Sequence, residues 1–469
     1  MRVAHVAAEV APWCSSGGLG QVLGALPAAI ARTAPPGTEV AAYFPLCRLA
    51  SEAAASGELQ LTEVEIDVGG DGARLLRAES FGPHELYFVD APRYFDRPAL
   101  YGPYARPYSD DPERFAFFVQ VLERVWRQRG QPDVVHCHDW HVALLPAFLK
   151  RRPKGGSATV LTIHNLAYQG VFEGAEARRS SITPTDGVVN FLATGIEAAD
   201  VVTTVSPTYA IEILEDGAGL DAVLRARAAP IGILNGIDTD EWDPSADPSI
   251  PEPFTASAME GKGAARRQLA TKLGLDIGDS DLVVGVVSRL VDQKGIDLVI
   301  EAAADAERLG MRLAVVGDGD PELEKALLGL ALDQPGRVAA LIGWDKATAH
   351  LVIAGADALA VPSRFEPCGL TQMQAMRYGT IPIAHAVGGL RDTVIDPGDK
   401  ALAAGEGSGL TFDEPTAEAL VGAIERAAAL RRDNPQGWSA LQQAVMAIDW
   451  SWDRAAAGYL DLYSSLLAG

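Results

Sequence analysis

Short runs of apolar residues alternate along the chain with longer stretches in which apolar side chains recur every three or four positions. Such runs are typical of strands buried on both faces of a sheet, and the stretches between them are typical of amphipathic helices. The first half has runs at 3–8, 39–44, 86–89, 134–137, 159–163, 201–205 and 231–234. The second half has runs at 282–287, 312–316, 338–342, 358–361 and 381–384. The pattern predicts an α/β protein with two doubly wound, Rossmann-like domains.

The boundary between the two domains is predicted near residue 250. Segment 243–254 contains four prolines, which neither helix interiors nor central strands accept, so it is typical of a linker. We therefore expect an N-terminal domain over 1–250, a C-terminal domain over 251–450 and binding in a cleft between them. Residues 451–469 place large apolar side chains on one helical face. This predicts a C-terminal helix that packs back on the N-terminal domain.

Charge narrows the range of partners. The 469 residues carry a formal net charge of −23. A chain this acidic lacks the basic surface that nucleic acid or an anionic membrane requires, so a small molecule or a neutral polymer is expected. No run of about twenty apolar residues occurs, so no membrane span is expected. The chain also begins directly as a strand, without a signal-peptide pattern.

The cysteines bear on the redox setting. Cys14, Cys47, Cys137 and Cys368 are too few and too scattered for a disulfide framework in a chain of this length. We therefore expect reduced thiols and a cytoplasmic location.

Two segments of the first half combine a strand end with turn residues. Ser15, Gly17 and Gly18 lie where a helix follows the first predicted strand, and paired glycines let a backbone approach a ligand closely. Asn235 opens an acidic segment that ends at Asp243. Its carboxylates suggest a cation site, but a turn facing the cleft is favoured, because Asn-Gly and Asp turns need no metal.

Histidines gather after two further predicted strands. Segment 136–141 reads His-Cys-His-Asp-Trp-His, and segment 164–170 reads His-Asn-Leu-Ala-Tyr-Gln-Gly. A metal bound by His136, His138 and His141 is one interpretation, and structural packing is another. A sugar pocket is the favoured one, because strand ends with Asp, Trp and His supply stacking and hydrogen bonds to hydroxyls, and no second cluster completes a metal site. The candidate binding residues here are Asp139, His164 and Asn165.

The second half offers cations and glycines at strand ends. Arg289 and Lys294 lie in one strand-to-helix loop, where Arg supplies a bidentate donor to a phosphate and Lys a point charge. A solvated basic loop is the alternative. Gly317 ends the next strand, and Gly389 lies in a second glycine-rich helix start. Both are candidates for close approach of a nucleotide diphosphate.

The run 362–371, Pro-Ser-Arg-Phe-Glu-Pro-Cys-Gly-Leu-Thr, joins a buried strand to a helix. Unpaired N–H groups at such a helix start face an anion, and Glu366 lies within reach of a sugar attached to it. The candidate donor-binding residues of this junction are Cys368, Gly369, Leu370 and Thr371.

Taken together, these segments resemble the bacterial glycogen synthase and plant starch synthase family. The resemblance rests on the two histidine segments, on Asn-Gly-Ile-Asp at 235–238, on Ser-Arg-Leu-Val-Asp-Gln-Lys-Gly at 288–295 and on Glu-Pro-Cys-Gly-Leu-Thr at 366–371. It implies a GT-B fold, with two Rossmann-like domains and an interdomain cleft. It also implies a retaining transfer of glucose from ADP-glucose to an α-1,4-glucan, without metal or cofactor.

The resemblance also assigns roles to residues, and it makes Arg289, Lys294, Glu366 and His164 the expected catalytic residues. Arg289 and Lys294 would bind the donor diphosphate, Glu366 would be an essential acid beside the transferring glucose, and His164 would lie at the reacting carbon. Asp139 and Asn235 would bind glucose hydroxyls.

One loop departs from the family pattern. The family reads Lys-x-Gly-Gly-Leu-x-Asp, whereas Ser15 and Gln21 replace the lysine and the acid here. Arg93 or Arg97 would be the substitute cation. The departure keeps two alternatives open: a related GT-B enzyme with another nucleotide-sugar or a small acceptor, and a glucan-binding regulatory protein with weakened catalysis.

Overall fold

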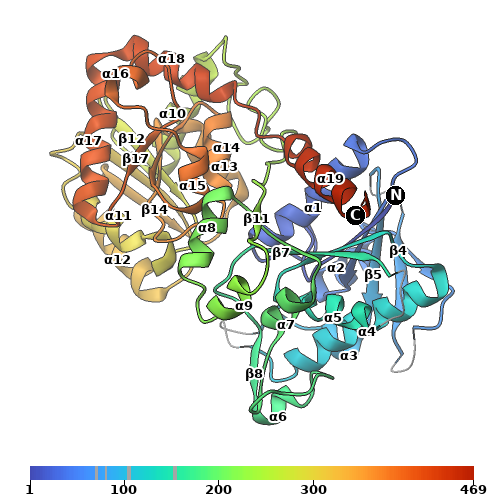
Figure 1. Ribbon diagram of the computed structural model, residues 1–469. Coiled ribbons are helices and arrows are strands. Elements are labelled where there is room, and N and C mark those ends of the chain that lie inside the picture. The colour runs from blue at the N-terminus through green and yellow to red at the C-terminus, as the bar shows by residue number, and fades with distance from the viewer. Residues whose placement is uncertain (69–71, 80–81, 103–106, 152–155, 469) are drawn as a thin grey trace. The chain divides into compact units, whose positions relative to one another are not determined.

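The computed structural model describes residues 1–68, 72–79, 82–102, 107–151 and 156–468. Figure 1 traces the chain from the N-terminus to the C-terminus. It forms two compact units, of which the first comprises Met1–Gly236 and Trp452–Gly469 and the second comprises Ile237–Ser451. Each unit contains its own sheet with parallel strands, which confirms the predicted fold class.

The sheet of the first unit carries the histidine segments. Its strands are β1 (Arg2–Val6), β2 (Glu39–Pro45), β3 (Leu61–Val64), β4 (Arg74–Ala78), β5 (Glu85–Asp90), β6 (Val134–His138), β7 (Ala158–Ile163), β10 (Val201–Thr204) and β11 (Ile231–Gly232). Among the described residues their order is β11-β10-β7-β6-β1-β2-β5-β4-β3. Pairing is parallel from β11 to β5, whereas β4 pairs antiparallel with both β5 and β3. A separate antiparallel pair consists of β8 (Val171–Glu173) and β9 (Val188–Asn190).

Helices cover both faces of this sheet. They are α1 (Gly18–Thr33), α2 (Arg48–Ser56), α3 (Pro92–Phe95), α4 (Asp111–Arg129), the 3₁₀ turn η2 (Trp140–Val142), α5 (Leu144–Lys150), α6 (Gly174–Ala177), α7 (Phe191–Ala198), α8 (Pro207–Glu215), α9 (Asp221–Arg225) and α19 (Trp452–Ala468). One core cluster joins the sheet to α4, α5 and α7, and a second joins it to α1, α2 and α19. The start of α8 is set by its local sequence. The Ser206 side chain accepts a hydrogen bond from Tyr209 N, and Pro207 is the first residue of the helix.

The second unit has a six-stranded sheet in the described residues, in the order β14-β13-β12-β15-β16-β17, with parallel pairing throughout. The strands are β12 (Leu282–Val287), β13 (Met311–Gly317), β14 (Val338–Ile342), β15 (Ala358–Val361), β16 (Ile381–His385) and β17 (Leu410–Phe412). Its helices are α10 (Glu260–Leu273), the 3₁₀ turn η3 (Asp292–Lys294), α11 (Ile296–Ala303), α12 (Pro321–Asp333), α13 (Lys346–Gly355), α14 (Thr371–Arg377), α15 (Gly388–Thr393), α16 (Asp399–Leu402), α17 (Ala417–Asp433) and α18 (Pro435–Met446). None of the helices in the described part of the chain combines the length and apolarity needed to cross a bilayer.

The C-terminal helix α19 belongs to the first unit. Trp452, Tyr459 and Tyr463 are buried in the same core cluster as Leu26 and Ile30 of α1. Because these apolar side chains recur at helical spacing, one face of α19 is buried and the other is left to solvent.

The division between the units differs from the prediction. It falls after Gly236 rather than near residue 250, because the proline-containing segment packs on the second unit. Asp247 Oδ2 accepts hydrogen bonds from His350 Nδ1 at 2.8 Å and from Tyr378 OH at 2.6 Å. The Trp242 ring stacks on His350, with 4.0 Å between centroids. These buried contacts make the segment part of a core rather than a free linker.

The strands that sequence reasoning missed lie at or next to sheet edges, or outside the main sheets. β3 and β4 contain exposed polar residues and therefore lack the continuous apolar run of a central strand. β17 and the pair β8–β9 have three residues each, which is too short to leave a periodic signal.

The expectation of reduced thiols is wrong for two of the four cysteines. Cys14 and Cys47 form a disulfide, with their Cα atoms 6.1 Å apart. Cys14 follows β1 and Cys47 follows β2, and these neighbouring parallel strands bring the two residues together at one edge. Cys137 and Cys368 are free and buried. The cysteine count therefore no longer supports a cytoplasmic location.

Candidate active site

In the second unit, a lysine and a glutamate from two strand ends form an ion pair. Lys294 lies in the turn after β12 and Glu366 follows the neighbouring strand β15. Lys294 Nζ donates to Glu366 Oε2 at 2.6 Å, and Ser363 Oγ donates to the same oxygen at 2.9 Å. The side chain of Lys294 is 19% exposed, and that of Glu366 is 8% exposed. Two of the four predicted catalytic residues are thus in direct contact.

An ion pair and a close backbone approach hold together the two segments that carry Lys294 and Glu366. Arg364 donates from Nη1 and Nη2 to the two carboxylate oxygens of Asp297, at 2.8 and 2.6 Å. Gly295 has a φ of 64°, and a Cβ there would lie 2.2 Å from Pro362 O, so only glycine fits between the loops. The bidentate fork and the close approach fix where Lys294 meets Glu366.

Arg289 occupies the start of the same loop and is exposed. Within the described residues no side-chain partner of Arg289 is found, so its guanidinium is available to an anion. Gly317 ends the neighbouring strand β13, and a Cβ there would lie 1.9 Å from Ser288 O. Gly317 therefore allows two strand ends to pack closely beside Arg289.

The junction 366–371 begins α14 at Thr371, preceded by Leu370 without a side-chain cap. Gly369 has a φ of 74°, and its Cβ would collide with the Gln372 amide. Cys368 is buried, and its carbonyl accepts from Gln372 Nε2 at 3.1 Å. The chain turns sharply here, which brings Glu366 beside the start of the helix.

Gly389 has a different role from the predicted one. Its N–H donates to Glu366 O at 3.0 Å, and a Cβ at this position would lie 2.3 Å from the Cys368 backbone. The expected donation from Gly389 to a diphosphate is therefore replaced by close packing that supports the Glu366 loop.

In the first unit, Asp139 and His164 meet at the ends of β6 and β7. Asp139 has a φ of 61°, and its Oδ1 accepts from His164 N at 2.7 Å. Burial raises the pKa of Asp139 to about 7, against the opposing effect of N–H donors from His164 and Asn165. The Asn165 side chain caps its own turn by accepting from Ala167 N at 3.0 Å.

The histidines separate into two groups. His141 stacks on Tyr101, whereas His136 and His138 lie beside His5 of β1. The spacing of these three would allow a metal ion to bind. However, His136 donates to or accepts from Tyr463 OH and Thr162 Oγ1, and both nitrogens of His138 have histidine partners. These hydrogen bonds involve both ring nitrogens of His136 and His138, so protein groups hold the two rings in the described structure. The sugar-pocket interpretation of the segment stays a prediction.

The glycine loop is anchored by residues that sequence reasoning missed. Buried Glu9 accepts from Ser16 N and Ser16 Oγ, at 2.7 and 2.9 Å, and also from Tyr101 OH. An acid directly after an apolar strand was the available signal for Glu9. A Cβ at Gly17 or Gly18 would meet no atom within 4 Å, so both glycines border open space. Packing within the described structure therefore does not require glycine at either position.

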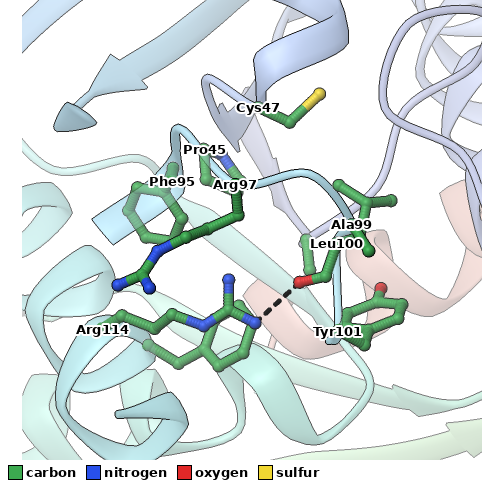
Figure 2. Close-up of a pocket in the computed structure, with 10 residues that line it drawn as sticks. Pro45, Cys47, Phe95, Arg97, Ala99, Leu100, Tyr101 and Arg114 are labelled. Atoms are coloured by element: carbon green, nitrogen blue, oxygen red, sulfur yellow. Dashed lines mark hydrogen bonds between the residues drawn. The ribbon is translucent and has the colours of Figure 1, made fainter. Parts of the chain in front are cut away.

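The two arginines expected to replace the family lysine are already paired. Arg97 donates to Asp110 and Arg93 to Glu113. Figure 2 shows Arg97 in the wall of a small pocket with Arg114, Tyr101 and Cys47. Arg114 is itself buried and donates to Leu100 O at 2.7 Å. None of these guanidinium groups is free to take the place of a lysine at Ser15.

Asn235, near the end of the first unit, is 7% exposed, and its Oδ1 has no partner in the described structure. It is therefore available to a ligand. The acidic residues after it form a turn, in which Asp238 Oδ1 accepts from the N–H groups of Asp240 and Glu241. This geometry agrees with the turn interpretation.

Comparisons with known proteins cover both units. The starch synthase catalytic domain family matches residues 2–226, and the group 1 glycosyl transferase family matches residues 272–438. A glycogen synthase of Methylocella silvestris is 44% identical, over 100% of this chain and 99% of its own length. One from Acidiphilium cryptum is 40% identical, over 99% of each chain.

Solved structures also match this chain along its whole length. The catalytic domain of starch synthase IV from Arabidopsis thaliana, bound to ADP and acarbose, has a TM-score of 0.87 and 31% identity. The match covers 100% of this chain and 99% of that one. Sucrose-phosphate synthase from Thermosynechococcus elongatus, with a TM-score of 0.63 and 20% identity, shares the fold.

Proposed function

Because this chain belongs to the glycogen and starch synthase family, we propose that it extends an α-1,4-glucan with glucose from ADP-glucose, with retention of configuration. Its relatives and its domains make it a hexosyltransferase. ADP as the nucleotide is supported by the ADP-bound starch synthase that it resembles. The glucan acceptor is supported by the glycogen synthases to which it is similar.

The observation that carries the proposal is the contact between Lys294 and Glu366 at neighbouring strand ends. A cation and an acid in this position suit a donor that combines a diphosphate with a sugar. Arg289 and Lys294 would bind the diphosphate, and Glu366 would accept a hydrogen bond from a glucose hydroxyl. Asp139, His164, Asn165 and Asn235 of the first unit would serve the same reaction.

The transfer exchanges one glycosidic bond for another. The bond from glucose C1 to the diphosphate oxygen breaks, and a bond from C1 to the acceptor hydroxyl oxygen forms on the same face. The hydroxyl proton passes to the departing phosphate. The negative charge that develops on the diphosphate is stabilised by Arg289 and Lys294 without a covalent intermediate.

We further propose that these two side chains supply the charge that a metal ion supplies in other phosphate-transfer sites, so that no cofactor is needed. Activity that is unchanged by a chelator would support this, and activity restored only by a divalent cation would contradict it. A cytoplasmic location also stays a prediction, and cell fractionation tests it.

The direct test is to incubate the purified protein with ADP-glucose and a malto-oligosaccharide. We expect release of ADP, lengthening of the oligosaccharide and an α-anomeric product by NMR. A protein that binds glycogen but releases no ADP would instead be a glucan-binding protein. Ser15 and the paired states of Arg93 and Arg97 favour slow turnover, so the assay should run long enough to detect it.

A further inference from the structure

Three histidines form a continuous hydrogen-bonded chain across neighbouring strands of the first unit. His5 Nδ1 lies 3.1 Å from His138 Nε2, and His138 Nδ1 lies 3.0 Å from His164 Nε2. The residues come from β1, from β6 and from the loop after β7, which are adjacent in the sheet. The chain therefore runs from the interior of the unit to a residue of the candidate active site.

The two ends of this hydrogen-bonded chain of histidines differ in their surroundings. His5 and His138 are fully buried, and His5 Nε2 has no hydrogen-bond partner in the described structure. His164 is half-buried, and no described residue contacts its Nδ1 by a hydrogen bond. One end is thus closed inside the protein, and the other is open to solvent or substrate.

All three rings are neutral near pH 7. Burial lowers the pKa of His5 and that of His164 to about 3. Burial also holds the pKa of His138 well below its usual range. Each neutral ring has one N–H donor and one acceptor nitrogen.

Because each ring has a single donor, the three N–H groups must all point the same way along the chain. If they point toward His5, a buried N–H is left without an acceptor at His5 Nε2, an arrangement that folded proteins rarely tolerate. If they point toward His164, the buried end carries only an unprotonated nitrogen. In that case His164 accepts at Nε2 and presents Nδ1–H at the open end.

We propose that His5 and His138 are positioning residues that fix the tautomer of His164, so that its Nδ1–H donates to an oxygen of the transferring hexose. The proposal rests on the proposed function, because it needs the hexose to bind beside His164. A fixed donor adds a hydrogen bond without the cost of reorganising the ring during transfer.

The first test reads the tautomer directly. ¹⁵N NMR of the full-length, unliganded protein with labelled histidine distinguishes a protonated Nδ1 from a protonated Nε2, and loss of signals in His164→Asn assigns the residue. We expect His164 to be protonated at Nδ1. A proton at Nε2 in the wild-type protein would overturn the proposal. This measurement does not depend on activity, so it tests the tautomer of His164 even if the protein transfers no glucose. An inactive protein would refute the proposed function alone.

The second test changes the buried end. In His5→Asn, the amide nitrogen can take the place of imidazole Nδ1 and donate to His138, whereas His5→Leu removes the donor. We expect His5→Leu to lower kcat about tenfold, with little change in KM for ADP-glucose, and to give mixed His164 tautomers. We expect His5→Asn to restore both kcat and the single tautomer. Unchanged kcat and an unchanged tautomer in His5→Leu would contradict the positioning role.

A matched control separates positioning from packing. Tyr463 OH lies 2.7 Å from His136 Nδ1 in the same buried cluster, but this bond is not part of the chain to His164. Tyr463→Phe therefore removes a buried hydrogen bond of the same kind. We expect it to lower stability and to leave kcat and the His164 tautomer unchanged. A loss of kcat equal to that of His5→Leu would mean that general packing, not the chain, controls the site.

Discussion

Lys294 Nζ lies 2.6 Å from Glu366 Oε2, although the two residues are 72 positions apart in the sequence. The pair keeps both partly buried charges compensated before substrate binds. A bound diphosphate would compete with Glu366 for the ammonium group. Glu366 would then still accept from Ser363 Oγ and could turn its other oxygen to a sugar hydroxyl. The ion pair thus holds both groups ready for a donor.

Glu366→Gln tests this arrangement, because glutamine has the same shape without the charge. We expect the protein to stay folded and kcat to fall about 100-fold or more, since the acid interacts with charge that develops during transfer. Initial rates of ADP release measure the effect. Glu425→Gln is the control: Glu425 forms an equally short ion pair with Arg308, but this pair is half-exposed on the surface. Its rate should match wild type, and a wild-type rate in Glu366→Gln would refute the assignment.

The second-unit half of the site was readable from the sequence for a physical reason. Parallel strands place their carboxyl ends at one edge, so Lys294 after β12 and Glu366 after β15 were expected at the same edge, and the pairing of β12 with β15 brings them into contact. Both strands consist of buried apolar residues and glycine, which made them visible in the sequence. The fork between Arg364 and Asp297 was not readable, because it depends on side-chain directions.

Three features that the sequence did not reveal depend on strand order, on loop folding or on close packing. The Cys14–Cys47 disulfide requires β1 and β2 to be neighbours, which periodicity alone does not reveal. The participation of Glu9 likewise depends on how the loop after β1 folds back on it. The role of Gly389 was misjudged because a glycine-rich helix start serves close packing as well as anion binding.

Asp247 should contribute to the stability of the second unit in a pH-dependent way. Burial alone would raise its pKa, but hydrogen bonds from His350 and Tyr378 lower it to about 2. A lowered pKa means that the contribution is complete above about pH 4, the unfolded value, and is lost as pH falls toward 2. We expect Asp247→Asn to lower the free energy of unfolding by about 2 kcal/mol at pH 7 and by less at pH 3.

Urea unfolding at the two pH values measures this difference. Asp240→Asn is the control, because Asp240 lies in the preceding acidic turn and has an exposed side chain. Its effect should stay within about 0.5 kcal/mol at both pH values. An equal loss for Asp247→Asn at pH 7 and pH 3 would contradict the ionic role of Asp247.

The disulfide should stabilise the first unit. Its two cysteines are 33 residues apart, and closing a loop of this length raises the free energy of the unfolded chain by about 4 kcal/mol. We expect the Cys14→Ser/Cys47→Ser variant to melt at a lower temperature than wild type. A reductant should lower the melting temperature of the wild-type protein and leave that of the variant unchanged. Equal melting of the two proteins without reductant would show that the bond adds no stability.

Ser15→Lys tests whether the departure from the family pattern limits turnover. Arg93 and Arg97 are paired with acids, so a lysine at 15 would add a cation that the first unit lacks at this loop. A charge-assisted hydrogen bond is worth about 1.5–3 kcal/mol, so kcat/KM for ADP-glucose should rise by about tenfold or more. Ser15→Met adds similar length without charge and should give no gain. The gain should shrink as salt increases, because salt screens the added charge. An unchanged kcat/KM in Ser15→Lys would mean that the loop binds the donor through other groups, such as the open backbone at Gly17 and Gly18.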